Sequence, residues 1–359
     1  MARRISEFLF ESLRCCMSFV NNALITKIKT LHAHDLSEED YQELLKKKSV
    51  YDVAVYLKNH DAYKEILSNV AESSLNRLRL EGLIKRQKFN QTVKLIKFVT
   101  LKDKSFYLLN FIHMEHEIIL EVIKGFISKE EYDVAAQIPY YFEKYSKIDF
   151  KALTKAENID GLLEVLNDTR YYKMLKPYAK TKNENLRYYE FESLFENDYY
   201  NYAFKQIEKN YRGRLRKSLE SAFESRIEME NMIKVYRLKK FYKIEGRDIK
   251  TILIPSTRIV EKKLNEIIAI ENPDDIFEAI IVSGVGPFVG DKDQVYLEYF
   301  NDHLRFHTAR KFMYYSNAAP AVFTAYMFFS ELEIENLTHI IEGIHYKLDE
   351  QEIRSMLVF

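Results

Sequence analysis

A segment of about 110 residues recurs three times along the chain, and this repetition limits the fold to three similar units. Each copy ends on two acids one residue apart, followed by asparagine in the second and third copies; these signature residues are Glu115 and Glu117, then Glu228, Glu230 and Asn231, then Glu333, Glu335 and Asn336. Apolar residues follow each signature at i, i+3 and i+4, as Leu337, Ile340 and Ile341 do in the last copy. This spacing predicts one buried face of a helix in each unit.

A second marker, at the front of each copy, supports the repeat independently. Residues 36–63 superpose on residues 145–172 with a constant shift in numbering. The shift pairs Ser37 with Ser146, Tyr41 with Phe150, Leu44 with Leu153, Leu57 with Leu166, and Tyr63 with Tyr172. A second constant shift aligns the third copy with the second and gives Leu264, Ile267, Asn272, Ile276 and Ile280 for Phe150, Leu153, Asn158, Leu162 and Leu166. The two markers together predict three units: residues 1–127 with an additional N-terminal helix, residues 128–243, and residues 244–359.

The composition favours long helices in every unit. Only 9 glycines and 6 prolines interrupt 359 residues, and residues 188–243 contain one glycine and no proline, which predicts one or two long helices there. Residues 251–255 and 279–283 have the composition of short strands, but the repeat aligns the second run with a helix. We therefore predict an all-α protein in which residues 279–283 are helical.

Charge and apolar runs exclude several functional classes. Lys plus Arg equals Asp plus Glu at 54 each, whereas a nucleic-acid-binding protein usually has a net basic surface. Cys15 and Cys16 are adjacent, which suits neither a disulfide framework nor a CxxC motif and indicates a reducing compartment.

The longest apolar run, residues 318–329, has about 12 residues where a bilayer needs about 20, so no membrane span is expected. Residues 1–24 predict an amphipathic helix that packs on the first unit, with a membrane-surface anchor as the alternative.

The sequence does not predict an active site or a cofactor site. Residues 284–292 have the glycines of a phosphate-binding loop, but Asp291 stands where a P-loop has lysine, so a turn between helices is expected. The paired acids could serve as a general acid and base. Their recurrence in each unit favours packing or salt bridges between units instead, because an active site is rarely built three times in one chain.

The histidine pairs do not predict a metal site either. His303 and His307 have the i, i+4 spacing of zinc ligands, but Leu304 occupies the position where the metalloprotease motif has glutamate. His113 and His116 stand at i, i+3 without an identifiable third ligand. We expect both pairs to be structural or exposed to solvent.

Two stretches carry a resemblance to a known family. The front motif LSEEDYQELLKKKSVYDVAVYLKNHDAYKEIL and the ending ENLTHIIEGIHYKLDEQEIRSML resemble the C subunit of prokaryotic V-type (A-type) ATPases, a relative of the eukaryotic V-ATPase d, or AC39, subunit. The family's Leu-x-x-Thr-x-Tyr block is matched from Leu57 to Tyr63, with His60 in place of Thr, and from Leu166 to Tyr172. The sequence departs from the family at Lys27 and Lys29, which replace arginines, and at Ile118, which replaces asparagine. The resemblance covers residue 20 to the end.

The resemblance implies three helical bundles arranged about a pseudo-threefold axis as a funnel. It further implies a non-catalytic rotor subunit on the cytoplasmic face of the membrane-embedded proteolipid ring. Its socket would receive the central shaft, subunits D and F, and pass torque between ATP hydrolysis or synthesis and H+ or Na+ transport. The alternative is a free-standing helical scaffold or adaptor, although units of this length exceed the 20 to 50 residues of ordinary solenoid repeats.

Overall fold

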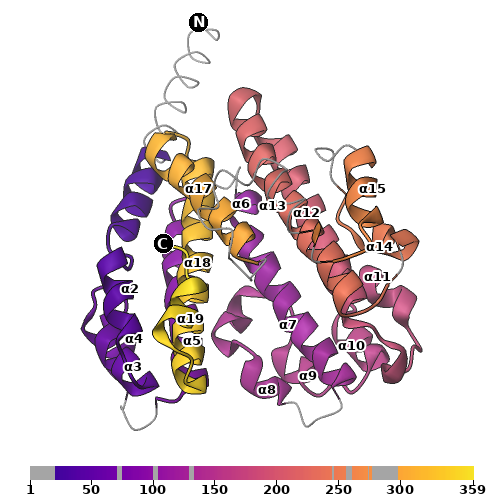
Figure 1. The fold of residues 1–359 in the computed structure, drawn as a ribbon, viewed down its shortest axis with the longest axis horizontal. Coiled ribbons are helices and arrows are strands. Elements are labelled where there is room, and N and C mark those ends of the chain that lie inside the picture. Colours follow the sequence, from indigo (N-terminus) through magenta and orange to yellow (C-terminus); the bar gives the residue numbers. More distant parts are fainter. Residues whose placement is uncertain are drawn as a thin grey trace, which may run out of the picture. The chain divides into compact units, whose positions relative to one another are not determined.

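The computed structural model describes residues 21–70, 75–99, 104–128, 133–244, 246–255, 261–273, 275–276 and 298–359. Within these ranges the secondary structure is helical, with no strand, which confirms the all-α prediction (Figure 1). Residues 251–255, one of the two strand-like runs, contain the end of α14 (Gly246–Ile252). The N-terminal 20 residues, the run 279–283 and the loop 284–292 lie outside the described ranges.

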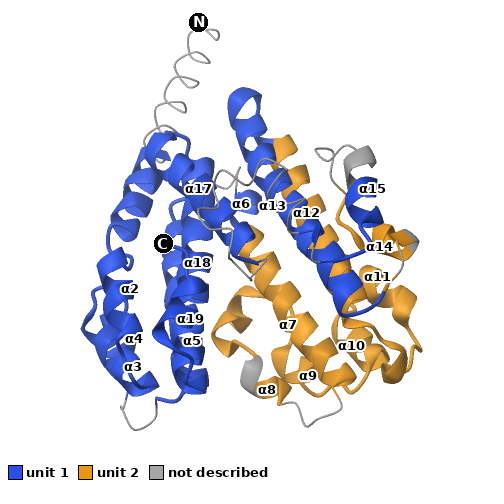
Figure 2. Ribbon diagram, viewed as in Figure 1, with its two compact units in different colours: residues 1–107, 210–243, 256–359 blue, residues 108–209, 244–255 orange. Residues whose placement is uncertain are grey.

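The chain divides into two compact units (Figure 2). Unit 1 comprises residues 1–107, 210–243 and 256–359, and unit 2 comprises residues 108–209 and 244–255. Both units are assembled from segments that are far apart in the sequence. They therefore follow tertiary packing rather than the linear order of the three repeats.

Unit 1 is built around α18 (Ala319–Tyr346), the helix that carries the third signature. α18 packs against α17 (Glu298–Tyr315) and α5 (Arg77–Ile96), and α13 (Gly213–Lys240) packs against α17. The other described helices are the helical residues 21–32, α2 (Glu38–Leu45), α3 (Val50–Asn59), α4 (Lys64–Leu67), α6 (Lys104–Tyr107), α15 (Glu261–Ala269) and α19 (Glu350–Ser355). A core of apolar side chains from α2, α3, α4, α5, α18 and α19 joins the two ends of the chain.

Helix ends in unit 1 follow the capping signals of the sequence. Ser37 and Asp40 form a capping box at the start of α2, and Asp349 and Glu352 form another at the start of α19. α18 ends at Lys347 in the left-handed conformation, and the Leu348 amide donates to the Gly343 carbonyl. A Cβ at Gly343 would lie 2.5 Å from Ile353 Cγ1, so α19 can pack over α18 only because this residue is glycine.

Unit 2 is built around α7 (Leu109–Ile127), the helix that carries the first signature. The remaining elements are α8 (Val134–Gln137), the 3-10 turn η2 (Tyr140–Tyr145), α9 (Phe150–Leu153), α10 (Ile159–Val165), α11 (Tyr171–Leu175), η3 (Lys176–Tyr178), η4 (Asn183–Asn185), α12 (Tyr188–Asn210) and α14. The predicted long helices of residues 188–243 are α12 and α13. The one glycine of that stretch, Gly213, has φ 61° at the break between them.

The front motif has the same local structure in the first two copies. Its four aligned apolar positions are at most 3% exposed in both copies, as Tyr41, Leu44, Val53 and Leu57 and as Phe150, Leu153, Leu162 and Leu166. The helices after the first turn begin at aligned N-caps, where Ser49 accepts from the Asp52 amide and Asn158 accepts from the Gly161 amide. The repeat inferred from sequence is therefore a repeat of buried positions and helix starts.

Each signature helix packs against the front motif of the following copy. In unit 2, α7 at the end of the first copy bonds to residues of the second front motif. In unit 1, α13 at the end of the second copy packs on α15 of the third front motif, and α18 at the end of the third copy packs on α3 of the first. We call a signature helix together with the front motif that it packs on a module. Each sequence repeat therefore contributes to two modules, and α18 connects the last copy to the first.

Candidate functional site

A buried cluster of charges lies beside the third signature in unit 1. The Lys88 Nζ on α5 lies 2.7 Å from Asp35 Oδ1 and 2.8 Å from Glu333 Oε1 on α18. All three side chains are 9% exposed or less. Burial by itself lowers the pKa of Lys88, but the two carboxylates outweigh it and raise the pKa. The lysine is therefore a buried cation held between two acids.

Neighbouring groups complete this cluster. The Tyr63 hydroxyl donates to Glu333 Oε1 at 2.6 Å, and His32 Nδ1 lies 2.9 Å from Asp35 Oδ2. The His32 ring stacks on Phe329 of α18 with centroids 4.4 Å apart. Burial raises the pKa of Asp35, but Lys88 and His32 outweigh it and hold the pKa below the ordinary value. The cluster therefore joins four segments that are distant in the sequence: residues 32–35, Tyr63, Lys88 and residues 329–333.

Unit 2 holds an equivalent contact at the first signature. Glu115 on α7 accepts hydrogen bonds from the Ser146 hydroxyl at 2.6 Å and from the Tyr171 hydroxyl at 2.5 Å. Tyr171 is 1% exposed, and burial together with Glu115 raises its pKa. The first acid of the signature thus bonds a buried tyrosine of the following front motif in both units, since Glu333 bonds Tyr63 in the same way.

The structure assigns this role to Tyr171 rather than to its neighbour Tyr172. Tyr172 is half-buried, with Lys176 Nζ 5.7 Å from its ring centroid. The constant shift fails here because the turn from Leu166 to Tyr171 is one residue shorter than the turn from Leu57 to Tyr63. The pattern Leu-x-x-Thr-x-Tyr, counted strictly from Leu166, ends at Tyr171 and carries the signal that the alignment missed.

His60 takes the place of the threonine in the first turn and makes the corresponding contact. The Thr169 hydroxyl accepts from the Tyr171 amide at 3.2 Å, and His60 Nδ1 accepts from the Ala62 amide at 3.2 Å. Each side chain therefore fixes the turn by accepting from a backbone amide two residues later. This contact explains how the first copy keeps its buried tyrosine without the threonine.

The second acid of each signature makes a different contact. Glu117 is 63% exposed and lies 3.5 Å from His113, while Glu230 accepts from Arg226 Nε at 2.8 Å. Glu335 accepts from Arg305, which is 4% exposed and also bonds Asp302 and Glu331. Arg226 of α13 reaches the same Glu331 carboxylate at 3.1 Å, so one salt-bridge network joins α13, α17 and α18. The spacing of the signatures does not point to these arginines.

The asparagines of the signature are buried. Asn336 donates to the Val358 carbonyl at 2.8 Å and accepts from the Val358 amide at 3.0 Å, which ties the residues after α19 to α18. Asn231 is 1% exposed, and Glu228 is half-buried on the same helix. The positions of the third front motif that correspond to Tyr63 and Tyr171 lie outside the described ranges.

The histidine pairs sit in structural surroundings. His303 and His307 lie on α17 with ring centroids 6.1 Å apart, and burial lowers the pKa of His303 to about 4. His116 Nε2 lies 3.1 Å from Asp198, which also pairs with Arg170. Over the described ranges, no group of three or more His, Cys, Asp or Glu side chains is arranged to hold a metal ion. In the same part of the chain, no helix has the length and apolar character needed to cross a bilayer.

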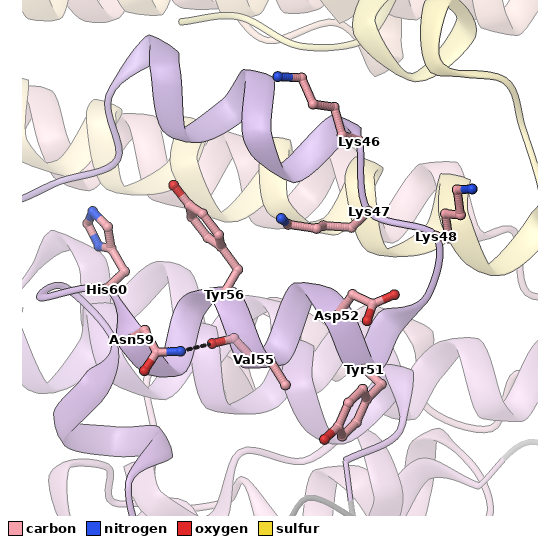
Figure 3. Close-up of a pocket in the computed structure, with 9 residues that line it drawn as sticks. All are labelled: Lys46, Lys47, Lys48, Tyr51, Asp52, Val55, Tyr56, Asn59 and His60. Atoms are coloured by element: carbon pink, nitrogen blue, oxygen red, sulfur yellow. Dashed lines mark hydrogen bonds between the residues drawn. The ribbon is translucent and has the colours of Figure 1, made fainter.

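An open groove of about 680 Å³ lies on unit 1 between α2 and α3 (Figure 3). Its lining residues are Lys46, Lys47, Lys48, Tyr51, Asp52, Val55, Tyr56, Asn59 and His60. The Tyr56 hydroxyl donates to Asp40 Oδ1 at 2.6 Å, and burial together with this bond raises the pKa of Tyr56 to about 12. Lys47 Nζ lies 5.1 Å from the centroid of the Tyr56 ring.

The buried tyrosine contacts predict a measurable loss of stability. Tyr171→Phe removes the hydroxyl that donates to Glu115 Oε2, and Tyr63→Phe removes one of two donors to Glu333 Oε1, the other being Lys88. Each variant loses a buried hydrogen bond to a carboxylate, so the free energy of unfolding should fall by about 1–3 kcal/mol. The control is Tyr172→Phe, which should change it by less than about 0.5 kcal/mol. Denaturant unfolding of the purified chain measures all three. A loss at Tyr172 that equals the loss at Tyr171 would contradict the structural assignment.

Comparison with known proteins identifies the family of the chain. The family described as ATP synthase (C/AC39) subunit matches residues 24–356, nearly the whole chain. Among curated proteins, none matches the sequence significantly. The matched region includes the three front motifs, all three signature helices and the buried cluster around Lys88. The chain therefore belongs to the ATP synthase (C/AC39) subunit family.

Proposed function

We propose that the protein is a non-catalytic central-stalk subunit of a rotary V-type or A-type ATPase. In this role it links the proteolipid ring of the membrane sector to the shaft subunits D and F, and transmits torque for ATP-coupled proton or sodium transport. The family match over residues 24–356 carries this proposal. The ring holds the protein at the cytoplasmic side of the membrane, and the chemistry of ATP belongs to other subunits.

The packing of the described residues suits a part that must carry load. A torque-bearing part must resist shear between its helices, and contacts that join segments distant in sequence oppose such shear. The Lys88 cluster joins α5 and α18 to the segment that precedes α2, and the Arg305 network joins α13, α17 and α18. Long helices such as α13 and α18, at 28 residues each, add stiffness along their axes.

The same packing supports a proposal for the arrangement of the three repeats. Each signature helix packs on the front motif of the next copy, and the last helix packs on the first front motif. We propose from this order of packing that the three repeats are related by a pseudo-threefold axis with a socket for the shaft, as the resemblance to the family implies. In this proposal the signature residues Glu115, Glu333 and Asn336 hold the modules together.

Isolation of the native complex tests the proposed role. The chain carries an affinity tag, native membranes are solubilised gently, and the captured material is analysed for its subunits and for ATP hydrolysis. We expect a multisubunit complex that hydrolyses ATP and contains a small proteolipid. Recovery of the chain alone, or with soluble partners only, would contradict the rotor role and favour the helical scaffold.

A direct binding measurement tests the contact with the shaft. The purified chain is titrated with the D–F pair, and an unrelated all-helical protein of similar size serves as the control. We expect saturable binding to the tagged chain and weaker or no binding to the control. Equal binding to both proteins would contradict the proposed socket.

A further inference from the structure

We propose that the groove between α2 and α3 binds an acidic segment of a partner protein that carries carboxylates interspersed with apolar side chains. The lining contains three lysines, at positions 46 to 48, against one acid, Asp52. The proposal does not rest on the rotor role, because binding by the isolated chain tests it. None of its lining residues belongs to the buried cluster around Lys88 or to the Arg305 network, although His60 also fixes the turn before Tyr63.

The charges of the groove are arranged along its length. Figure 3 shows Lys47 and Tyr56 pointing into the space between the two helices, with Lys48 and His60 toward opposite ends. The lysine ammonium groups in this view do not point at one common spot. A compact phosphate needs donors that converge on it, whereas a polypeptide with several carboxylates can pair with cations spread along a groove.

The groove also has apolar and aromatic surface. The rings of Tyr51 and Tyr56 and the side chain of Val55 line it, and Tyr51 is 46% exposed. Tyrosine is enriched at protein–protein interfaces because its ring supplies contact area at a small cost in side-chain entropy. Cations beside exposed rings therefore match a segment that presents both acids and apolar side chains.

Local contacts hold several lining residues in place before binding. Asp40 accepts from the Tyr56 hydroxyl at 2.6 Å and lies 3.5 Å from His60 Nε2, and Lys46 pairs with Glu43 at 2.7 Å. Burial raises the pKa of Asp40, but hydrogen bonds from Ser37 and Tyr56 outweigh it and lower the pKa. This pre-organisation lowers the entropic cost of binding.

Other anionic partners fit the groove less well. The chain has no net charge, so it lacks the overall basic field that nucleic-acid binders use. A membrane surface is flat on the scale of a side chain and cannot follow rings and a lysine that lie inside a groove. A polypeptide segment can lie along the groove and contact both the lysines that follow α2 and the rings of α3.

Titration of the purified full chain with a fluorescent random copolymer of glutamate and tyrosine tests the proposal. Anisotropy should show saturable binding that weakens as salt rises, since exposed charge pairs are screened. The variant Lys47→Gln/Lys48→Gln should bind about ten-fold more weakly, and Tyr51→Ala about three-fold more weakly. Circular dichroism checks that both variants stay folded, as expected for residues outside the core.

A matched control separates the groove from general charge. Lys155→Gln/Lys182→Gln makes the same change in charge at two exposed positions of unit 2 and should alter the affinity by less than about two-fold. Equal losses in the two double variants, or no loss in either, would overturn the proposal. Inorganic tripolyphosphate and phosphatidylglycerol vesicles are titrated in parallel. Binding of either one through Lys47 and Lys48, without binding of the copolymer, would show that the groove takes phosphate groups and overturn the proposal.

Discussion

Lys88→Met should lower the free energy of unfolding by about 3–5 kcal/mol. Methionine has nearly the shape of lysine, so the substitution removes the buried charge and leaves little cavity. Asp35 and Glu333 then lose the cation that lies within 2.8 Å of both, and two buried carboxylates remain close together. Glu333 must then bind a proton or remain as an uncompensated charge, and Asp35 keeps only His32 as a charge partner among the members of the cluster. Both changes cost free energy. Denaturant unfolding followed by circular dichroism measures the loss.

Two further variants isolate the charge as the cause. Lys94→Met makes the same change on α5 at a lysine that is 54% exposed, and should cost less than about 0.5 kcal/mol. The triple variant Asp35→Asn/Lys88→Met/Glu333→Gln removes all three charges and should recover most of the stability, because neutral replacements of buried ion pairs are often tolerated. If Lys88→Met were as stable as the parent protein, or if the triple variant were no more stable than Lys88→Met, the loss of stability could not be explained by the unpaired carboxylates.

Leu337→Asp should abolish cooperative unfolding of the chain. Leu337 is 0% exposed within the core that joins α18 to α2, α3 and α4. Loss of the leucine side chain alone costs about 2–5 kcal/mol, and the buried carboxylate adds several more. The sum approaches the whole stability of an ordinary domain, about 5–15 kcal/mol. Met232→Asp, at the aligned position of α13 and 1% exposed, should have the same effect.

The matched control is Leu78→Asp. Leu78 is 50% exposed in the first turn of α5, where an acid interacts favourably with the helix dipole. Its thermal unfolding should therefore stay close to that of the parent protein. If Leu337→Asp and Met232→Asp also unfolded at the parental temperature, the repeat helices would not form the core.

Local sequence patterns were sufficient to predict the helical fold class and the buried positions of the front motif. Apolar spacing in the front motif identified Leu44, Leu57, Leu153 and Leu166, which are all buried, because residues that share a helix face are a few positions apart in sequence. Ser37 and Asp40 likewise have the three-residue spacing of a capping box, and the structure contains one there. Such contacts depend only on nearby residues, and a single sequence therefore reveals them.

The partners of the signature residues could not be inferred in this way. Glu333 belongs to a repeated signature in the sequence, but its contacts with Tyr63 and Lys88 join positions far apart in the chain. Lys88 stands four residues after Ile84 and eight after Leu80, which places it on the buried face of α5, but this spacing does not identify the acids that pair with it. One residue fewer in the turn before Tyr171 was also enough to shift the alignment to Tyr172, because a constant shift cannot represent a deletion.

The sequence by itself determined the all-α class, the threefold repetition of its buried positions, the helix caps and the resemblance to the C/AC39 family. Only the tertiary structure decided that each signature helix packs on the next front motif, that the last helix packs on the first, and that Lys88 and Arg305 are buried between acids. Spacing within one helix fixes which face is apolar. Which other segment packs against this face depends on shape and charge complementarity between residues far apart in the sequence. Spacing within one helix contains no information about those residues.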